Sequence, residues 1–427
     1  MTLGAARCGQ AAPRAYEFAQ KWAVFHFVDG PSIRSLERVR ALPLFRAETP
    51  HPTHVPAAAP AERTPITETL ILAKAKIFSQ GLFVPDDLWA ELTDENHYRH
   101  KRAGLSQGRF FRLHDGAAST AVNAPVLEPF ARKSPLHLRR EGAGYAIFES
   151  DARLCAATPF SWPRWYGRTT SDGTPMSMVV SAHCDTSLYT AIYQGGCDYW
   201  QGDQMCKFCA MKIDQKSRWR SIDSIIEVVK VALEENPAAE ISFGGGTRLT
   251  PDKSARHKAD AIAELKKRAP LPVCVEMAPP DTDDWLDRLK DAGLDSILLN
   301  IELWDESIRR HMMPGKADIP RERYLSALRH SVKIFGPNQV SSQIIIGLEP
   351  LKDTLAAVRA VIDEGAIPLP VVFRPLPGTP LADTPPPPVD DVMTVFSETY
   401  RWMGEASLAG QESRSGCALC GACSAHR

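Results

Sequence analysis

The sequence predicts an α/β fold in which parallel strands alternate with helices. From Met176 onward, six short apolar segments alternate with six segments of helical periodicity over about two hundred residues. This alternation predicts parallel strands joined by right-handed crossovers. Gly293 and Gly365 stand where helix C-terminal glycines belong. An open doubly wound sheet and a barrel or partial barrel both fit the pattern, and both bind ligands at the C-terminal ends of their strands.

Each apolar segment is followed by a helical segment. The expected strands are residues 187–194, 239–243, 272–277, 296–302, 339–347 and 369–374. The expected helices are residues 222–235, 255–268, 282–292, 305–311, 321–334 and 351–364, with a final helix at 389–405 after a run of prolines. Four regions result: an irregular N-terminal segment at 1–63, an N-terminal extension or cover at 64–175, the strand–helix series at 176–384, and a C-terminal helix with a cysteine-rich tail at 385–427.

The extension at 64–175 has a mixed pattern. Residues 65–82 show helical spacing, and residues 145–148 form a short strand-like run. Neither feature assigns this region to a known domain. We expect it to cover the barrel.

Composition excludes several classes of function. The 427 residues are 44% hydrophobic and 24% charged, as in a globular protein with a sizeable core. With 50 basic and 51 acidic residues the formal net charge is −1, so we expect no nucleic acid as a partner. We also expect no membrane association, because no apolar run reaches the roughly 18–20 residues of a spanning helix. The N-terminus lacks the features of a secretory signal, so we expect a cytoplasmic protein with reduced thiols.

Six of the ten cysteines fall into two tight groups, which in a reducing compartment indicates metal rather than disulfides. The first group, here called the loop cysteines, is Cys197, Cys206 and Cys209. It follows the first expected strand, at the rim where ligands bind. Three thiolates can hold three irons of a [4Fe–4S] cluster and leave the fourth open to a small molecule. The alternatives are a zinc site that takes a fourth ligand from Cys184, His183 or the tail, and a fully ligated electron-transfer cluster.

This loop resembles the cluster loop of the radical S-adenosylmethionine (radical SAM) superfamily. The usual loop has spacers of three and two residues and an aromatic residue before the last cysteine. Phe208 matches the aromatic residue, whereas the first spacer here has eight residues. The resemblance covers roughly residues 186–380, where further segments agree in order along the chain.

Those segments give the expected SAM-binding residues. The turn of Gly244, Gly245, Gly246 and Thr247 is similar to the superfamily's Gly-Gly-Glu turn, which holds the methionyl amino group, although the acidic residue is missing. Glu276, Asn300 and Glu302 match positions that contact the ribose or the amino group. Ile346 lies in a segment similar to the one near adenine, and residues 373–380 resemble a common sixth-strand ending. One of Arg309, Arg310 and Lys316 is expected to pair with the SAM carboxylate.

The resemblance implies a partial (β/α)6 TIM-type barrel that binds a [4Fe–4S] cluster with an open iron, together with S-adenosylmethionine. It implies reductive cleavage of SAM and hydrogen abstraction by a 5′-deoxyadenosyl radical from a small-molecule substrate. An external donor such as flavodoxin or ferredoxin would supply the electron. The reaction after hydrogen abstraction stays open among sulfur insertion, methylation, rearrangement and oxidation. A non-catalytic electron-transfer protein and a zinc-stabilised interaction module are the competing functions.

The second cysteine group, here called the tail cysteines, is Cys417, Cys420 and Cys423. These residues predict a second [4Fe–4S] cluster, whose fourth iron takes Cys155 or Cys184 as a protein ligand or stays open to the substrate. A zinc knuckle and a disordered tail are the alternatives. About eleven residues separate the tail cysteines from the last helix, so the tail has the reach to return to the barrel mouth.

Overall fold

The computed structural model describes residues 66–92, 108–192, 196–211 and 220–425. The chain divides into two units, Met1–Ala59 and Pro60–Arg427, and every feature described below belongs to the second. The expected irregular segment at 1–63 lies outside the described residues. No helix in the described parts of the chain is long and apolar enough to cross a membrane.

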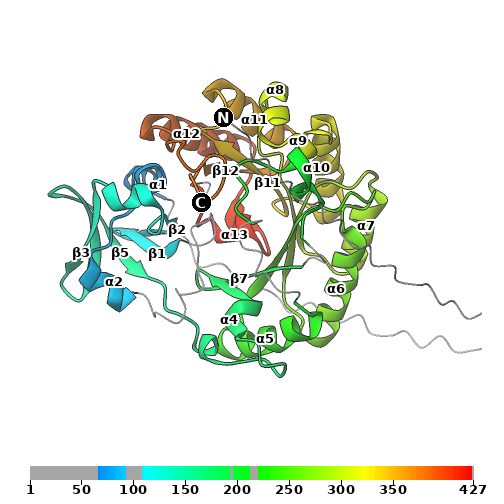
Figure 1. Cartoon of the computed structure of the whole chain (residues 1–427), viewed down its shortest axis with the longest axis horizontal. Helices are drawn as coiled ribbons and strands as arrows, with labels where there is room; N and C mark the ends of the chain where they lie inside the picture. The colour runs from blue at the N-terminus through cyan, green and yellow to red at the C-terminus, as the bar shows by residue number, and fades with distance from the viewer. Residues whose placement is uncertain (1–65, 93–107, 193–195, 212–219, 426–427) are drawn as a thin grey trace, which may run out of the picture. The chain divides into compact units, whose positions relative to one another are not determined.

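A seven-stranded sheet forms the centre of the second unit and curls into a half-barrel (Figure 1). The strand order is β12-β11-β10-β9-β8-β7-β6, and neighbouring strands are parallel except for β6 and β7. The bounds are β6 Ser181–His183, β7 Ser187–Ala191, β8 Glu240–Gly244, β9 Val273–Met277, β10 Ser296–Leu299, β11 Val340–Ile346 and β12 Ile367–Val372. The α/β partial barrel expected from the sequence is therefore confirmed, with β6 as an added edge strand.

Helices cover the outer face of this sheet (Figure 1). Two of them begin at polar caps: Ser221 accepts a hydrogen bond from the Ser224 amide at the start of α5, and Asp305 accepts one from the Ile308 amide at the start of α8. Gly293 and Gly365 have positive φ where helices end. The bounds are α4 Met176–Val179, α5 Ile222–Glu235, α6 Ala255–Arg268, α7 Asp284–Asp291, α8 Glu306–Met312, α9 Pro314–Ala317, α10 Arg321–Phe335, α11 Leu351–Asp363 and α12 Val389–Glu405.

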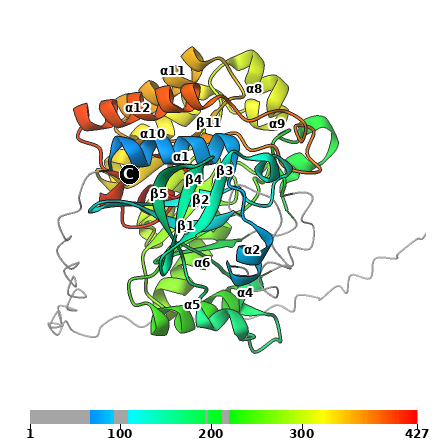
Figure 2. The same cartoon turned by 90° about the vertical axis from the view of Figure 1, so that its left-hand side faces the viewer.

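The extension folds as an antiparallel sheet with two helices (Figure 2). Its strand order is β2-β1-β5-β4-β3, and α1 packs on β2 and β5. The elements are α1 Glu68–Gln80, α2 Asp86–Leu92, β1 Arg109–Asp115, β2 Ala118–Ala124, β3 Leu136–Glu141, β4 Gly144–Glu149 and β5 Ala152–Pro159, with 3-10 turns at Pro129–Lys133 and Arg164–Gly167. The strand-like run at 145–148 is the middle of β4. The other four strands were not expected.

This second sheet contacts both sides of the half-barrel's open edge. Near β6, the ring of His183 stacks on Phe110 of β1 with centroids 5.2 Å apart. Near β12, Arg374 pairs with the buried Glu128 at 3.2 Å. On the same side α1 packs on α12, where Phe78 meets Phe396 edge to face. Residues 66–92 and 108–159 therefore contact the half-barrel on both sides of its opening.

The C-terminal tail, residues 406–425, enters the interior of the curled sheet from the N-terminal ends of the strands. Ser415 Oγ lies 2.7 Å from Ser296 Oγ at the start of β10. The Gly416 amide donates to Glu240, the first residue of β8, at 3.0 Å. After the turn η5 (Gly410–Glu412), the short helix α13 (Cys417–Cys420) lies in the middle of the half-barrel (Figure 1).

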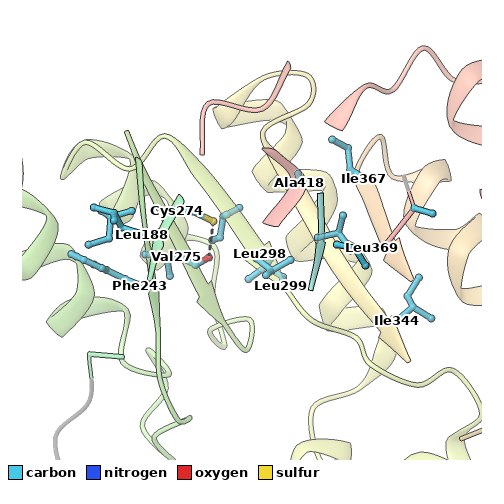
Figure 3. Close-up of a cluster of buried hydrophobic side chains, with 14 of the residues drawn as sticks. Leu188, Phe243, Cys274, Val275, Leu298, Leu299, Ile344, Ile367, Leu369 and Ala418 are labelled. Carbon is cyan, nitrogen blue, oxygen red and sulfur yellow. Dashed lines mark hydrogen bonds between the residues drawn. The ribbon is translucent and has the colours of Figure 1, made fainter. Parts of the chain in front are cut away.

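The end by which the tail enters was not foreseen, because the sequence suggested only that it returns to the barrel mouth. Residue type explains the docking. Gly416 has φ +86°, and a Cβ there would lie 2.5 Å from the Cys274 sulfur, so only glycine passes this point without displacement. Ala418 then packs beside Leu369 of β12 (Figure 3).

The contact between the tail and Glu240 predicts a pH-dependent stability. Burial raises the pKa of Glu240 to about 8 from its ordinary 4.5, so between these values folding takes up a proton. This contribution is complete below about pH 4.5 and is lost as the pH rises through 8. At about 1.4 kcal/mol per pKa unit, the loss amounts to several kcal/mol.

We therefore expect the melting temperature of the wild type to fall between pH 6 and pH 9 more steeply than that of Glu240→Gln. Glutamine stays neutral, and its side-chain oxygen still accepts the Gly416 hydrogen bond. Thermal unfolding at both pH values, with matched iron content, measures the difference. Parallel pH profiles would contradict the assignment.

Candidate functional site

The loop cysteines lie at the C-terminal end of β7, and hydrogen bonds fasten their loop to the end of β8. The Asp198 amide donates to the Thr247 carbonyl at 2.9 Å, and the Asp198 carboxylate accepts from the Leu249 amide at 2.8 Å. On the other side of the loop, the Lys207 amide donates to the Met312 carbonyl at 2.8 Å. The cluster loop thus lies between the end of β8 and α8.

The expected glycine turn packs directly on the first cysteine. A Cβ at Gly246 would lie 2.5 Å from the Cα and Cβ of Cys197, and one at Gly244 would meet the Tyr189 hydroxyl. Gly245 has φ +141°, in the region that favours glycine. The Thr247 amide donates to the Cys197 sulfur at 3.4 Å. The turn and the loop cysteines therefore form one site.

The loop thiols influence one another electrostatically. Burial raises the pKa of Cys206 to about 12, and Cys209 and Cys197 add to this rise. Burial also raises the pKa of Cys209. A buried thiol with a raised pKa stays protonated at neutral pH unless a metal takes the proton's place. Cys206 and Cys209 therefore do not present reactive thiolates at neutral pH.

The three basic residues after β10 that were expected to include the partner of the SAM carboxylate differ in their surroundings. Lys316 Nζ donates to Glu302 Oε1 at 2.8 Å, and both side chains are largely buried. Burial lowers the pKa of Lys316, but Glu302, Tyr324 and Cys206 together outweigh burial and raise it, so the ammonium stays charged. Arg309 is fully buried and donates to the carbonyls of Ile301, Leu303 and Ile319. Arg309 therefore has a structural role, in which it holds these three backbone positions together.

Arg310 differs, because its side chain is 63% exposed and pairs with Glu306. Among the three basic residues the geometry favours Lys316. The fold holds it in place: a Cβ at the neighbouring Gly315 would enter the ring of Tyr199, which belongs to the cluster loop.

Glu302 has a strained backbone. Its φ is +67°, although the sequence predicted a regular strand through this residue. Regular pairing in β10 ends at Leu299, and Glu302 makes only an isolated bridge to Ile344 of β11. A non-glycine residue held in this region costs on the order of 1–3 kcal/mol and is typical of functional sites. The strain points Glu302 out of the ladder toward Lys316.

Glu276 and Asn300 form a polar row across the interior of the barrel. Asn300 Nδ2 donates to Glu276 Oε1 at 2.7 Å, and Asn300 Oδ1 accepts from the Gln343 amide at 3.1 Å. Burial raises the pKa of Glu276, and the Glu302 carboxylate adds to the rise. Gln343, which the sequence did not single out, continues the row to the tail, since its Nε2 lies 3.9 Å from the Cys417 sulfur.

Ile346 is buried in the large core of the second unit, whereas its neighbour Ile345 faces inward. Ile345 belongs to a group that we call the inner apolar layer, whose members are Leu303, Met313, Ile345, Leu348, Val371 and Phe373. Cys206 and Phe208 of the loop and Cys423 of the tail pack against this layer. Because successive side chains of a strand point to opposite faces, the strand pattern alone places Ile345 and Ile346 on different faces.

The tail cysteines lie beside Cys184 rather than Cys155. The Cys184 and Cys420 sulfurs are 3.6 Å apart. Cys184 stands in the turn between β6 and β7 with φ +52°. Cys155 is buried in β5, where burial raises its pKa to about 12. All nine cysteines in the described residues carry free thiols.

No group of three or more His, Cys, Asp or Glu side chains among the described residues is arranged around a single metal ion. The ligands of a four-iron cluster each meet a different iron, so they need not converge on one point.

The family model of the radical SAM superfamily matches residues 195–361. This range contains the loop cysteines, the glycine turn, Glu302 and Lys316. The chain carries a radical SAM domain. Such domains use a [4Fe–4S] cluster and SAM. The resemblance to the radical SAM superfamily, inferred from the loop and the motifs that follow it, is confirmed.

Known proteins similar to the chain include a relative named bacteriochlorophyllide c C-7(1)-hydroxylase, from Chlorobaculum limnaeum. It is 26% identical over 367 residues, which cover 80% of this chain and 84% of the relative. Among solved structures, HydG, a maturase of the [FeFe]-hydrogenase, matches 54% of this chain and 52% of its own at a TM-score of 0.40 and 16% identity. Methylornithine synthase matches 57% and 72% at 0.41 and 14% identity.

The residues present fit the family's cofactors. Three thiols of one loop supply ligands for three irons and leave one iron open. The glycine turn lets the backbone approach Cys197, and the buried Lys316 offers a positive charge near Cys206, whose thiol it affects electrostatically. When bound, the cluster supplies the electron that cleaves SAM.

We predict that Gly246→Ala lowers the iron held by the loop, because the new methyl group would displace the Cys197 backbone. Anaerobic reconstitution followed by iron analysis and a SAM-cleavage assay should show at least a tenfold loss of cleavage. Gly404→Ala is the matched control, since a Cβ at Gly404 meets nothing within 4 Å. Equal cleavage by the two variants would mean that the turn does not position the cluster loop.

Proposed function

We propose that this protein is a radical SAM enzyme that abstracts a hydrogen atom from a carbon of a small-molecule substrate, with a second iron–sulfur cluster held by the tail cysteines. One observation carries the proposal: Cys206 of the loop and Cys423 of the tail pack against the same inner apolar layer. Two groups of cysteines from distant parts of the chain thus face one apolar region. A reactive carbon radical needs such surroundings.

The residues of the chain have distinct parts in this proposal. The loop cysteines hold the cluster, and the turn of Gly244 to Thr247 positions the methionyl end of SAM. Lys316 pairs with the SAM carboxylate, which competes with Glu302 for the ammonium. Glu276 and Asn300 meet the ribose or the amino group. The inner apolar layer excludes water around the carbon that reacts.

The relative named as a hydroxylase supports an oxidation at a C–H bond as the reaction class. It spans 80% of this chain, including much of the region outside the matched radical SAM domain. The apolar lining near Phe208 and Met313 favours a substrate whose reacting part is itself apolar. An external one-electron donor, of the flavodoxin or ferredoxin class, would reduce the loop cluster.

Two cysteine variants test the proposal in one experiment. After anaerobic reconstitution we expect about eight irons per chain in the wild type, and about four when Cys417, Cys420 and Cys423 are changed to Ala. Cys206→Ala should abolish formation of 5′-deoxyadenosine from SAM and reductant, whereas the tail variant should retain part of it. Chromatography and iron analysis measure both. Full SAM cleavage by Cys206→Ala would refute the loop assignment, and full iron in the tail variant would refute the second cluster.

A separate prediction concerns SAM binding. Lys316→Met should weaken SAM binding about tenfold or more, because a hydrogen bond between charged groups contributes roughly 1.5–3 kcal/mol. Arg310→Gln should change it by less than about twofold, since Arg310 is exposed and paired with Glu306. Equilibrium binding of SAM to both variants, with the cluster intact, makes the comparison. The reverse order of effects would assign the carboxylate to Arg310.

A further inference from the structure

The tail cysteines have a fourth thiol at hand. Cys184 reaches them from the turn between β6 and β7, more than two hundred residues earlier in the chain, and its sulfur lies 3.6 Å from that of Cys420. Cys184 also influences Cys423 electrostatically, so it borders more than one member of the trio. A non-glycine residue at φ +52° is uncommon, and this conformation aims the Cys184 side chain at the tail.

The surroundings of these four sulfurs suit a bound group that carries negative charge. Asn123 Nδ2 donates to the Cys423 sulfur at 3.5 Å, and Gln343 Nε2 lies 3.9 Å from the Cys417 sulfur. Lys74, with no exposed surface, donates through Nζ to the Gly421 carbonyl at 2.8 Å and lies near Cys184 and Cys423. Thiolate ligands of a bound cluster would interact favourably with this ammonium group.

Three separate parts of the chain meet at this point. Two of them are the tail and the β6–β7 turn. The third is the cover, because the Asn123 backbone amide of β2 donates to the Ala422 carbonyl at 2.7 Å. A surface cleft of about 510 Å³ is lined by Cys184, Arg112, His114 and Trp162 among others. Cys184 is only partly buried.

We propose that Cys184, Cys417, Cys420 and Cys423 together ligate the tail's [4Fe–4S] cluster, so that every iron has a protein ligand. The inference rests on the second cluster of the proposed function and adds its fourth ligand. Assembly takes iron and sulfide from solution and releases the four thiol protons. A cluster with four cysteine ligands has no open iron, so it does not bind substrate directly. It passes single electrons and ties the cover, the tail and the β6–β7 turn together.

The test isolates the tail cluster in the full-length chain by changing Cys197, Cys206 and Cys209 to Ala. This parent protein should contain about four irons after anaerobic reconstitution. Its reduced electron paramagnetic resonance spectrum should not change when cyanide, a small ligand for open iron, is added. Adding Cys184→Ala should either lower the iron content or make the spectrum sensitive to cyanide, while Cys155→Ala should behave like the parent.

The outcomes distinguish the existence of the second cluster from the identity of its fourth ligand. A parent that holds about four irons but responds to cyanide, or a Cys184→Ala variant indistinguishable from the parent, overturns Cys184 as the fourth ligand and leaves the second cluster in place. A parent without iron overturns the second cluster itself, and with it this inference. Iron that follows Cys155 instead of Cys184 would assign the ligand to β5 and also overturn the proposal.

Discussion

The burial of two groups of thiols, each beside an ammonium group, organises the interior of the barrel. Burial raises the pKa of Cys206, Cys417 and Cys423, so these thiols stay protonated at neutral pH unless a metal takes the place of the protons. Lys316 lies beside the loop and pairs with Glu302, and Lys74 lies beside the tail. Thiolates that form on metal binding would therefore place negative charge close to both ammonium groups.

The two ends of the half-barrel have different roles. The C-terminal ends of the strands carry the cluster loop, the glycine turn and the Glu302–Lys316 pair, as in other parallel α/β folds. The N-terminal ends bind the tail through Glu240 and Ser296. Because the tail occupies the lower part of the interior, a substrate that reaches the inner apolar layer has to approach from the upper end or past the cover.

The sequence allowed the strand–helix series to be predicted because each element there is locally consistent. Helices α5 and α6 have the bounds that their periodicity indicates, and the loop cysteines lie at the expected strand end. Prediction failed where the structure depends on distant partners. The sheet of β1 to β5 pairs strands whose apolar alternation is weak, and β6 has three residues, too few for a periodic signal.

Side-chain direction was the other part that sequence patterns did not resolve. Ile346 and Ile345 differ only in which face of β11 they occupy, and Arg310 and Lys316 only in whether a helix turns them outward. Polar residues at alternate positions of the barrel strands did carry a signal. Glu240 and Ser242, Cys274 and Glu276, and Ser341 and Gln343 are each two apart, which places polar groups on one face of each strand. A parallel sheet normally buries both faces in apolar contacts.

The first spacer of the cluster loop attaches the loop to two neighbouring parts of the barrel. Its eight residues include Asp198, which joins the loop to Thr247 and Leu249, and Tyr199, which packs on Gly315. Gly315 directly precedes Lys316, whose ammonium pairs with Glu302. In this chain the loop expected to hold the metal therefore also contacts the segment that carries the cation expected to bind SAM.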